Sequence, residues 1–115
     1  MSSAFPSKDD SRNSPAKIFH RSAILSVDNS TSIPAKTIDI SAAGLSVMLD
    51  RPLREGGKVT IVINVILNDE PGQARFTCRV RSNVLAGMKG FRIGLEFADP
   101  DAATSRLIKQ LMSGV

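Results

Sequence analysis

Residues 73–82 read QARFTCRVRS, and residues 91–97 read FRIGLEF. In the first stretch Phe76, Cys78 and Val80 alternate with polar or charged residues, and the second stretch alternates in the same way. Because successive side chains of a β-strand point to opposite faces, this alternation predicts two strands, each with one buried and one outward face. Cys78 is expected in the core, between its two apolar neighbours on that face.

Four further β-rich runs lie before these two, each closed by turn residues: 22–27, 33–39, 44–49 and 58–67. Residues 68–72 (NDEPG) predict a chain reversal, with Pro71 and Gly72 at the turn. A set of six short strands needs its edges paired or covered. The sequence therefore predicts a mainly β fold, a six-stranded antiparallel β-barrel with a C-terminal α-helix.

The end of the chain has the pattern of that helix. Asp99 is expected as the N-cap, Pro100 as the first helical residue and Asp101 near the positive end of the helix dipole. Gly114 is expected to stop the helix. The apolar residues repeat at helical spacing: Leu107, Ile108, Leu111 and Met112.

Length and polarity indicate one domain. Of the 115 residues, 1–15 are polar with no apolar periodicity, which predicts a disordered tail ahead of a domain at 16–115. The tail lacks the apolar core of a signal peptide, and no later run approaches the ~20 apolar residues of a membrane span. A cytoplasmic protein without membrane contact is expected.

Composition excludes several kinds of site. With one His and one Cys, the chain has no internal disulfide framework and no structural zinc site. Nucleophilic catalysis of the Ser-His-Asp or Cys-His kind would have to rest on His20 alone. We therefore expect a binding protein rather than an enzyme, with no metal and no cofactor.

Two segments do not look like generic barrel sequence. Lys17-Ile-Phe-His-Arg21 places two cations four residues apart before the first strand, and Asp39-Ile-Ser41-Ala-Ala-Gly44 joins two strands. The second segment reads as a tight turn, in which Asp39 and Ser41 bond nearby amides and Gly44 adopts a strained dihedral. It also reads as a recognition site, since a carboxylate can accept both hydrogen bonds of a guanine edge. The cations read either as a solvated basic stretch or as an anion clamp.

Together the two segments resemble the PilZ domain family, whose hallmarks are RxxxR before a six-stranded barrel and D/NxSxxG about twenty residues later. The D/NxSxxG motif is matched in full, whereas RxxxR is matched at Arg21 and altered at Lys17. Ala16 stands where many members place a further Arg. An ammonium lacks the planar fork of a guanidinium, so this replacement is not conservative.

The resemblance implies a receptor for cyclic di-GMP. It assigns nucleotide binding to Lys17, Arg21, Asp39, Ser41 and Gly44, with Arg81 and Arg92 completing the floor of the site. His20 and Arg79 are further candidates; a lone His beside Phe19 also reads as a partly buried structural group.

Three functions remain open at this point. The first is a cyclic di-GMP receptor that orders its segment 14–21 on binding and signals to a partner protein in trans. The second is an adaptor that no longer binds the nucleotide and acts through protein contacts. The third is an RNA- or single-stranded DNA-binding barrel, which the absence of Tyr and Trp argues against. The net charge of +4 is expected on the hairpin 75–92, which holds five cations and no acid: Arg75, Arg79, Arg81, Lys89 and Arg92.

Overall fold

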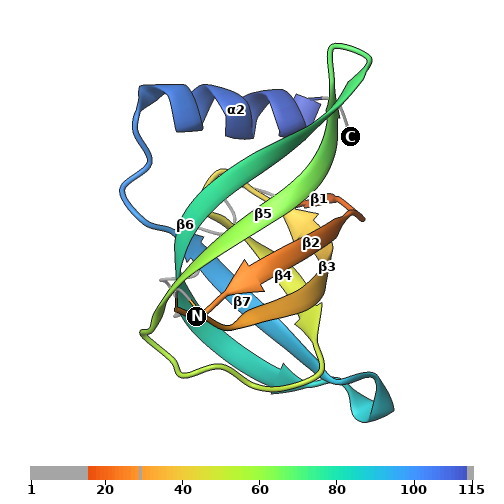
Figure 1. Ribbon diagram of the computed structural model, residues 1–115, viewed down its shortest axis with the longest axis vertical. Helices are drawn as coiled ribbons and strands as arrows, with labels where there is room; N and C mark the ends of the chain where they lie inside the picture. The colour runs from red at the N-terminus through yellow and green to blue at the C-terminus, as the bar shows by residue number, and fades with distance from the viewer. Residues whose placement is uncertain (1–15, 29, 114–115) are drawn as a thin grey trace, which may run out of the picture.

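The computed structural model describes residues 16–28 and 30–113. The predicted tail at 1–15 and the predicted helix stop at Gly114 lie outside these residues. The elements are β1 (Lys17–Ile18), β2 (Ser22–Ser26), β3 (Ser32–Ile40), β4 (Gly44–Leu49), β5 (Lys58–Leu67), β6 (Glu70–Leu85), the 3-10 turn η1 (Gly87–Lys89), β7 (Phe91–Phe97) and α2 (Ala102–Ser113) (Figure 1).

The strands close into a barrel. Their order is β1-β3-β2-β5-β6-β7-β4, every pairing is antiparallel, and a further pairing of β3 with β4 completes the ring. Strands β2–β7 form the six-stranded barrel that the sequence predicts, and β1 is an additional two-residue strand on β3. The alternating apolar residues face inward as expected, with Phe76, Cys78, Ile93 and Leu95 all buried.

The hairpin between β5 and β6 differs from the prediction. The reversal is made by Asn68 and Asp69 alone, with φ of 52° and 66°. Asn and Asp tolerate the left-handed region, so two such residues can form a tight hairpin turn. Pro71 and Gly72, which were expected at the reversal, lie inside β6 and pair with β5. That is why β6 begins at Glu70.

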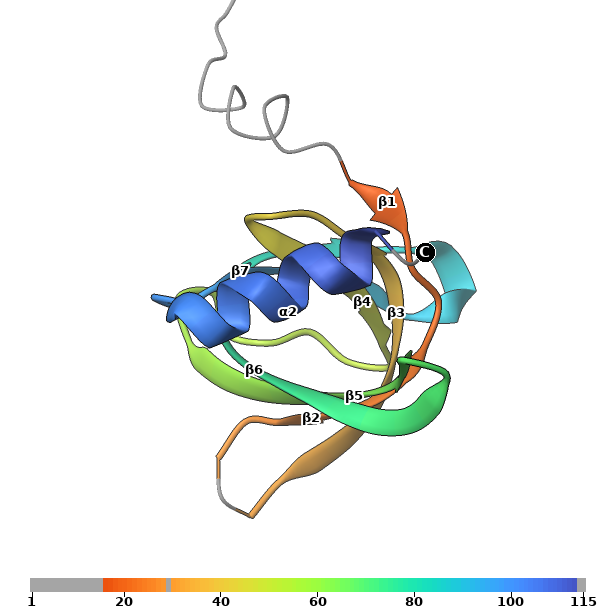
Figure 2. The ribbon, with the colours of Figure 1, turned by 90° about the horizontal axis from the view of Figure 1, so that it is seen from above.

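Helix α2 begins later than predicted. The N-cap is Asp101 rather than Asp99: its carboxylate accepts a 2.8 Å hydrogen bond from the amide of Thr104, and its carbonyl accepts the amide of Ser105. The bond from Thr104 lowers the pKa of Asp101. Asp99 instead has φ of 42°, outside the helix. Figure 2 shows α2 lying across one end of the barrel, where it buries Ile108 and Leu111.

Thr37 holds the segment between β1 and β2 in place by hydrogen bonds. It is the one buried polar side chain among the described residues. Its hydroxyl donates to the carbonyl of Phe19 and accepts a 2.7 Å hydrogen bond from the amide of Arg21. Two backbone bonds, from Phe19 to Ile38 and from Thr37 to Arg21, hold the same segment, and the Phe19 ring is buried in the core. No helix in the described part of the chain is long and apolar enough to cross a membrane.

Candidate functional site

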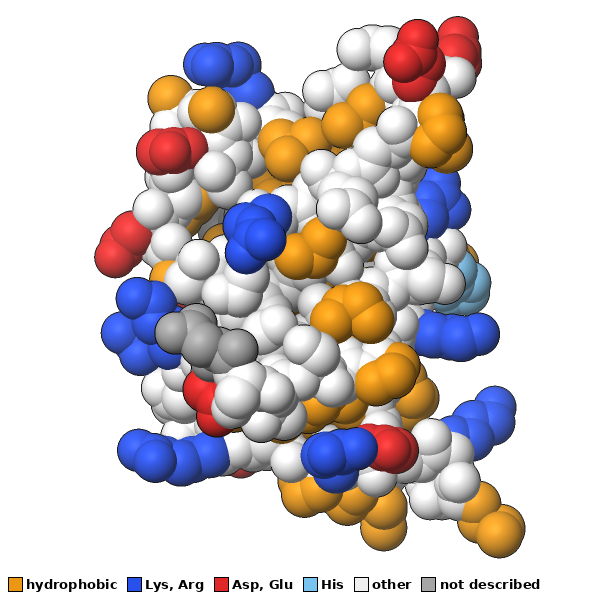
Figure 3. All heavy atoms as spheres, viewed as in Figure 1, with side chains coloured by type: hydrophobic (Ala, Val, Ile, Leu, Met, Phe, Trp, Pro, Cys, Tyr) orange, Lys and Arg blue, Asp and Glu red, His pale blue; other side chains and the backbone are white. Residues whose placement is uncertain are grey.

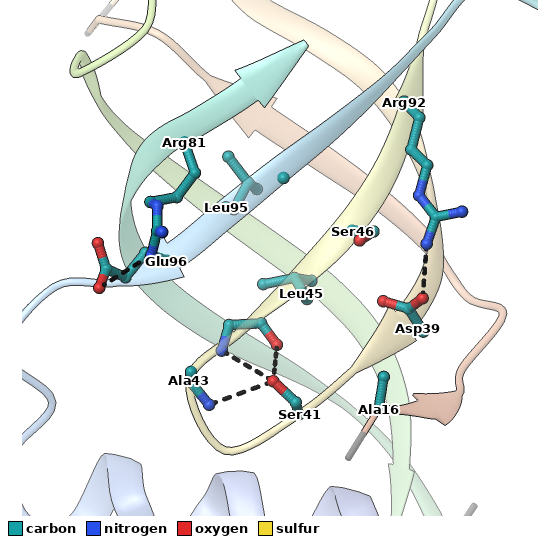
Figure 4. A pocket seen from close by; sticks show the side chains of 12 residues that line it. Ala16, Asp39, Ser41, Ala43, Leu45, Ser46, Arg81, Arg92, Leu95 and Glu96 are labelled. Atoms are coloured by element: carbon teal, nitrogen blue, oxygen red, sulfur yellow. Dashed lines mark hydrogen bonds and ion pairs between the residues drawn. The ribbon is translucent and has the colours of Figure 1, made fainter. Parts of the chain in front are cut away.

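A cavity of about 300 Å³ opens on the outer surface of the barrel, where β3, β4, β6 and β7 lie side by side (Figure 4). Five of the predicted site residues line it: Asp39, Ser41, Gly44, Arg81 and Arg92. The other lining residues are Ala16, Ala43, Leu45, Ser46, Gly94, Leu95 and Glu96. Sheet register thus brings together residues far apart in the sequence.

The floor of the cavity consists of small residues. Asp39 of β3 pairs with Ser46 of β4, and Ser46 pairs in turn with Gly94 of β7. A Cβ atom at Gly94 would lie 2.7 Å from the hydroxyl of Ser82, too close for ordinary contact. Because Ser46 and Gly94 fill so little space, a planar group can approach the backbone of the sheet there.

Two ion pairs flank this floor. Arg92 donates a 2.8 Å hydrogen bond to the carboxylate of Asp39, and Arg81 lies 3.4 Å from the carboxylate of Glu96 (Figure 4). The side chain of Asp39 is 21% exposed, while those of the other three residues are about half exposed or more. The cavity therefore offers two cations and two carboxylates whose charges balance.

The turn between β3 and β4 forms a third wall. The hydroxyl of Ser41 accepts the amides of Ala43 and Gly44 at 3.2 and 3.3 Å, as expected for a tight turn. Asp39 bonds to Arg92 rather than to a nearby amide, so that part of the turn interpretation is wrong.

Gly44 is required for a different reason from the expected strained dihedral. It is not among the glycines with positive φ. A Cβ atom there would lie only 1.9 Å from the carbonyl oxygen of Leu95, so no residue with a side chain fits at this position. Gly44 thus permits the close approach of β4 to β7.

The predicted clamp lies beside the cavity and not in it. Of the segment 16–21, only Ala16 lines the cavity; Lys17 belongs to β1 and pairs with Ile40. The guanidinium of Arg21 lies 5.6 Å from the ring centre of Phe19 and lines a second cavity of about 140 Å³ beside α2. His20 is exposed and lines neither cavity.

The cations of the hairpin 75–92 do not form one site, contrary to expectation. Arg81 and Arg92 converge on the cavity, whereas Arg79 bonds to the carbonyl of Gly56. Arg75 and Lys89 lie at two further hollows of the surface. A tightly curved strand distributes successive outward residues around the barrel, so proximity in the sequence does not gather them.

Seven of the twelve lining residues were not among the predicted site residues, and three of these seven have the outward parity of their strands: Ser46, Gly94 and Glu96. Their place in the site follows from register between strands, because Ser46 pairs with Asp39 and Gly94, and Glu96 pairs with Gly44. Among residues 16–28 and 30–113, no group of three or more His, Cys, Asp or Glu side chains could hold a metal ion.

A closed barrel with a polar, charge-balanced cavity on its outer surface defines a small β-barrel binding domain. Residues 10–114 match the family described as PilZ domain, and the chain belongs to that family. This confirms the resemblance that the two motifs indicated, and it makes the chain a non-catalytic module.

Solved structures share the fold. The inhibitor of motility MotI/DgrA of Bacillus subtilis has a TM-score of 0.72 at 17% identity, over 90% of this chain and 50% of that one. YcgR of Escherichia coli in complex with c-di-GMP has 0.74 at 15%, over 90% and 45%. The PilZ domain of YcgR with c-di-GMP has 0.65 at 17%, over 83% and 80%. The chain thus spans about half the length of the first two. No curated protein matches it.

Proposed function

We propose that this chain binds cyclic di-GMP in the cavity between Asp39, Arg92, Arg81 and the Ser46–Gly94 floor. The proposal is supported by membership of the PilZ family, and by the solved structures of similar fold that contain c-di-GMP. In this proposal the nucleotide-bound chain acts as a receptor that signals to a partner protein in trans.

The charge balance of the cavity is the observation on which the proposal rests. A simple anion that took Arg92 would leave the carboxylate of Asp39 without its partner, at the cost of an unpaired, partly buried charge. A ligand must therefore supply an anion to the arginines and hydrogen-bond donors to the carboxylate together. A guanine nucleotide does both, since the N1–H and N2–H₂ edge of its base donates and its phosphate accepts.

Each residue then has a definite role. Asp39 accepts the guanine edge, while Arg92 and Arg81 turn from their carboxylate partners to phosphate or to the acceptors of the base. The small floor at Ser46 and Gly94 admits the plane of the base. The Ser41 hydroxyl accepts two amides and donates to the carbonyl of Gly44 at 3.3 Å, and in this proposal it redirects that donated hydrogen bond to the ligand.

In this proposal Ala16, Lys17 and the side chain of Arg21 close over the bound nucleotide, while Phe19 stays in the core. Because β1 pairs over only two residues, Ala16 and Lys17 can leave β3 without disturbing the barrel. Arg21 has to leave the ring of Phe19 to reach the ligand. Closure repositions Ala16, Lys17 and the Arg21 side chain and produces a new surface for the partner.

A second candidate is the adaptor that has lost the nucleotide. It is favoured by Ala16, which puts a methyl group on the cavity wall where many PilZ domains have a guanidinium. The cavity contains no cation from the segment 16–21. Its affinity for cyclic di-GMP therefore depends on whether the side chains of Lys17 and Arg21 can move to the ligand.

Calorimetry with cyclic di-GMP separates the two candidates. The parent chain is expected to bind, and Arg92→Ala to bind roughly 10- to 150-fold more weakly, because a charge-assisted hydrogen bond contributes about 1.5–3 kcal/mol. Arg106→Ala, an exposed cation on α2, is the matched control and should bind like the parent. Ala16→Arg is expected to tighten binding.

The outcomes are distinct. If the parent releases no heat at about 100 µM ligand while Ala16→Arg binds, the adaptor candidate is correct and the missing guanidinium explains the loss. If neither protein binds, the nucleotide proposal fails altogether. Equal affinity of the parent and Arg92→Ala would show that the ligand lies elsewhere.

A further inference from the structure

A second part of the barrel surface combines apolar and basic residues. Strands β2, β5 and β6 and the adjoining start of β3 present their outward side chains there, and we call this surface the β2–β5–β6 face. Register arranges it in parallel rows. One row runs Pro34, Ile24, Val62 and Arg75; the next runs Ser32, Ser26, Thr60 and Thr77; a third contains Lys58 and Arg79. Figure 3 shows both hydrophobic and positively charged side chains on the side of the molecule where β2 and β5 lie in front in Figure 1.

The basic row is an unfavourable arrangement for the isolated chain. Lys58 and Arg79 are directly opposite one another, and like charges at paired positions of a sheet are destabilising. Among the described residues, neither side chain nor that of Arg75 forms an ion pair. Glu96 lies opposite Arg79 on the other side, and its carboxylate is engaged by Arg81.

A hollow of about 600 Å³ lies within this face, lined by Lys58, Arg75, Thr60, Thr77 and Asp28 among others. The one acid there is already engaged. The carboxylate of Asp28 accepts the amides of Ser30 and Thr31 and the hydroxyl of Ser30, at 2.8–2.9 Å, and these bonds lower its pKa. The hollow thus holds two threonine hydroxyls and two cations, and neither cation forms an ion pair with Asp28.

The apolar row lies directly beside these cations. Ile24 is 44% exposed and stands between Pro34 and Val62 on the neighbouring strands. Val27, the residue that follows this strand, is 41% exposed. A partner that complements this face must offer negative charge and apolar side chains within the span of four adjacent strands.

We propose that the β2–β5–β6 face is a docking surface for an acidic protein segment that also contains apolar residues. Carboxylates of the segment meet Lys58, Arg75 and Arg79, and its apolar side chains cover Ile24 and Pro34. The face is separate from the nucleotide cavity, so this proposal goes beyond the proposed function and does not depend on it.

The composition of the face favours a protein over a nucleic acid. Of the four described phenylalanines, Phe19, Phe76 and Phe97 are buried, and the half-buried Phe91 lies on β7, outside this face. The face therefore has no aromatic side chain on which a base could stack. The exposed apolar row gives phosphates nothing to bind. An acidic, partly apolar segment uses both halves of the face, because its carboxylates and its aliphatic side chains each find complementary groups.

The test uses the full chain and a labelled synthetic peptide in which glutamates alternate with leucines. We expect saturable binding by fluorescence anisotropy, and we expect the double variant Lys58→Glu/Arg75→Glu to weaken it at least about tenfold. The matched control is Arg106→Glu/Lys109→Glu, which makes the same change of net charge on exposed positions of α2 and should bind within about twofold of the parent. Ile24→Ser should also weaken binding.

Several results would overturn the proposal. One is an equal loss in both double variants, which would indicate attraction to net charge alone. Another is a labelled single-stranded oligonucleotide that binds more tightly than the peptide and no longer binds to Lys58→Glu/Arg75→Glu. This result would make the surface a nucleic-acid site. Thermal unfolding distinguishes misfolding from lost docking: Lys58→Glu puts opposite charges across from one another and should not lower the Tm. Cyclic di-GMP binding by the face variant should equal that of the parent.

Discussion

Replacing Thr37 by Val should release the chain between β1 and β2 while preserving the shape of the side chain. The Thr37 hydroxyl bonds to both the carbonyl of Phe19 and the amide of Arg21, and the residue is only 2% exposed. In Thr37→Val both backbone groups lose this partner in a place that water reaches poorly. An unsatisfied buried group costs about 1–3 kcal/mol, so we expect a loss of about 2–4 kcal/mol in the free energy of unfolding.

Thr37→Ser is the matched control. It keeps the hydroxyl and removes one methyl group, which costs about 1 kcal/mol. Chemical unfolding followed by circular dichroism gives both values, provided that the dependence on denaturant is unchanged. For a domain of this size, the loss in Thr37→Val corresponds to a Tm lowered by at least about 8 °C.

Two results would refute this reasoning. The first is a Thr37→Val protein within about 0.5 kcal/mol of the parent, which would mean that water or another group satisfies Phe19 and Arg21. The second is Thr37→Ser costing as much as Thr37→Val, which would assign the role of this residue to packing instead of to its hydroxyl.

Two further predictions concern the barrel itself. Gly44→Ala should lower the free energy of unfolding by at least about 3 kcal/mol, or prevent folding, because its Cβ would overlap the carbonyl of Leu95. Gly72→Ala is the control: nothing lies within 4 Å of the added atom, so the free energy of unfolding should be nearly unchanged. Burial raises the pKa of Cys78 from 9.0 to about 12, so near pH 8 its alkylation in the native protein should be roughly a thousandfold slower than in denaturant. Because the native thiol has the higher pKa, the free energy of unfolding keeps its full value below pH 9 and falls as the pH rises from 9 towards 12. Cys78→Ala should not show this fall.

The sequence predicted those parts of the fold that depend on local alternation. Strands β4, β5 and β7 have the predicted ends because turn residues bound each run: Asp50 follows β4, Gly57 precedes β5 and Gly90 precedes β7. The turn at Asn68 and Asp69 was placed wrongly because Pro71 and Gly72 are stronger turn residues in isolation, and only pairing with β5 places them inside a strand. The requirement for Gly44 could not be inferred, since it comes from Leu95 on another strand.

The candidate site shows the same division. Parity along single strands identified Arg81 and Arg92 as outward residues, and both line the cavity. Their carboxylate partners and the Ser46–Gly94 floor follow from register between strands, which one sequence does not reveal. Arg21 lies at a second cavity since its ring partner Phe19 points into the core and the guanidinium stacks against it. Its role at the nucleotide remains a prediction.

The short strand β1 has a consequence for how such a domain can evolve. Ala16 and Lys17 are exposed, belong to no part of the core, and are joined to β3 by two residues of pairing, whereas the chain from Phe19 onward is fixed by Thr37. Substitutions at 16 therefore change the wall of the cavity, and those at 17 change a cation beside it, at little cost in stability. Affinity for the ligand can drift, be lost or be regained there by single mutations, while selection maintains the barrel for its other contacts.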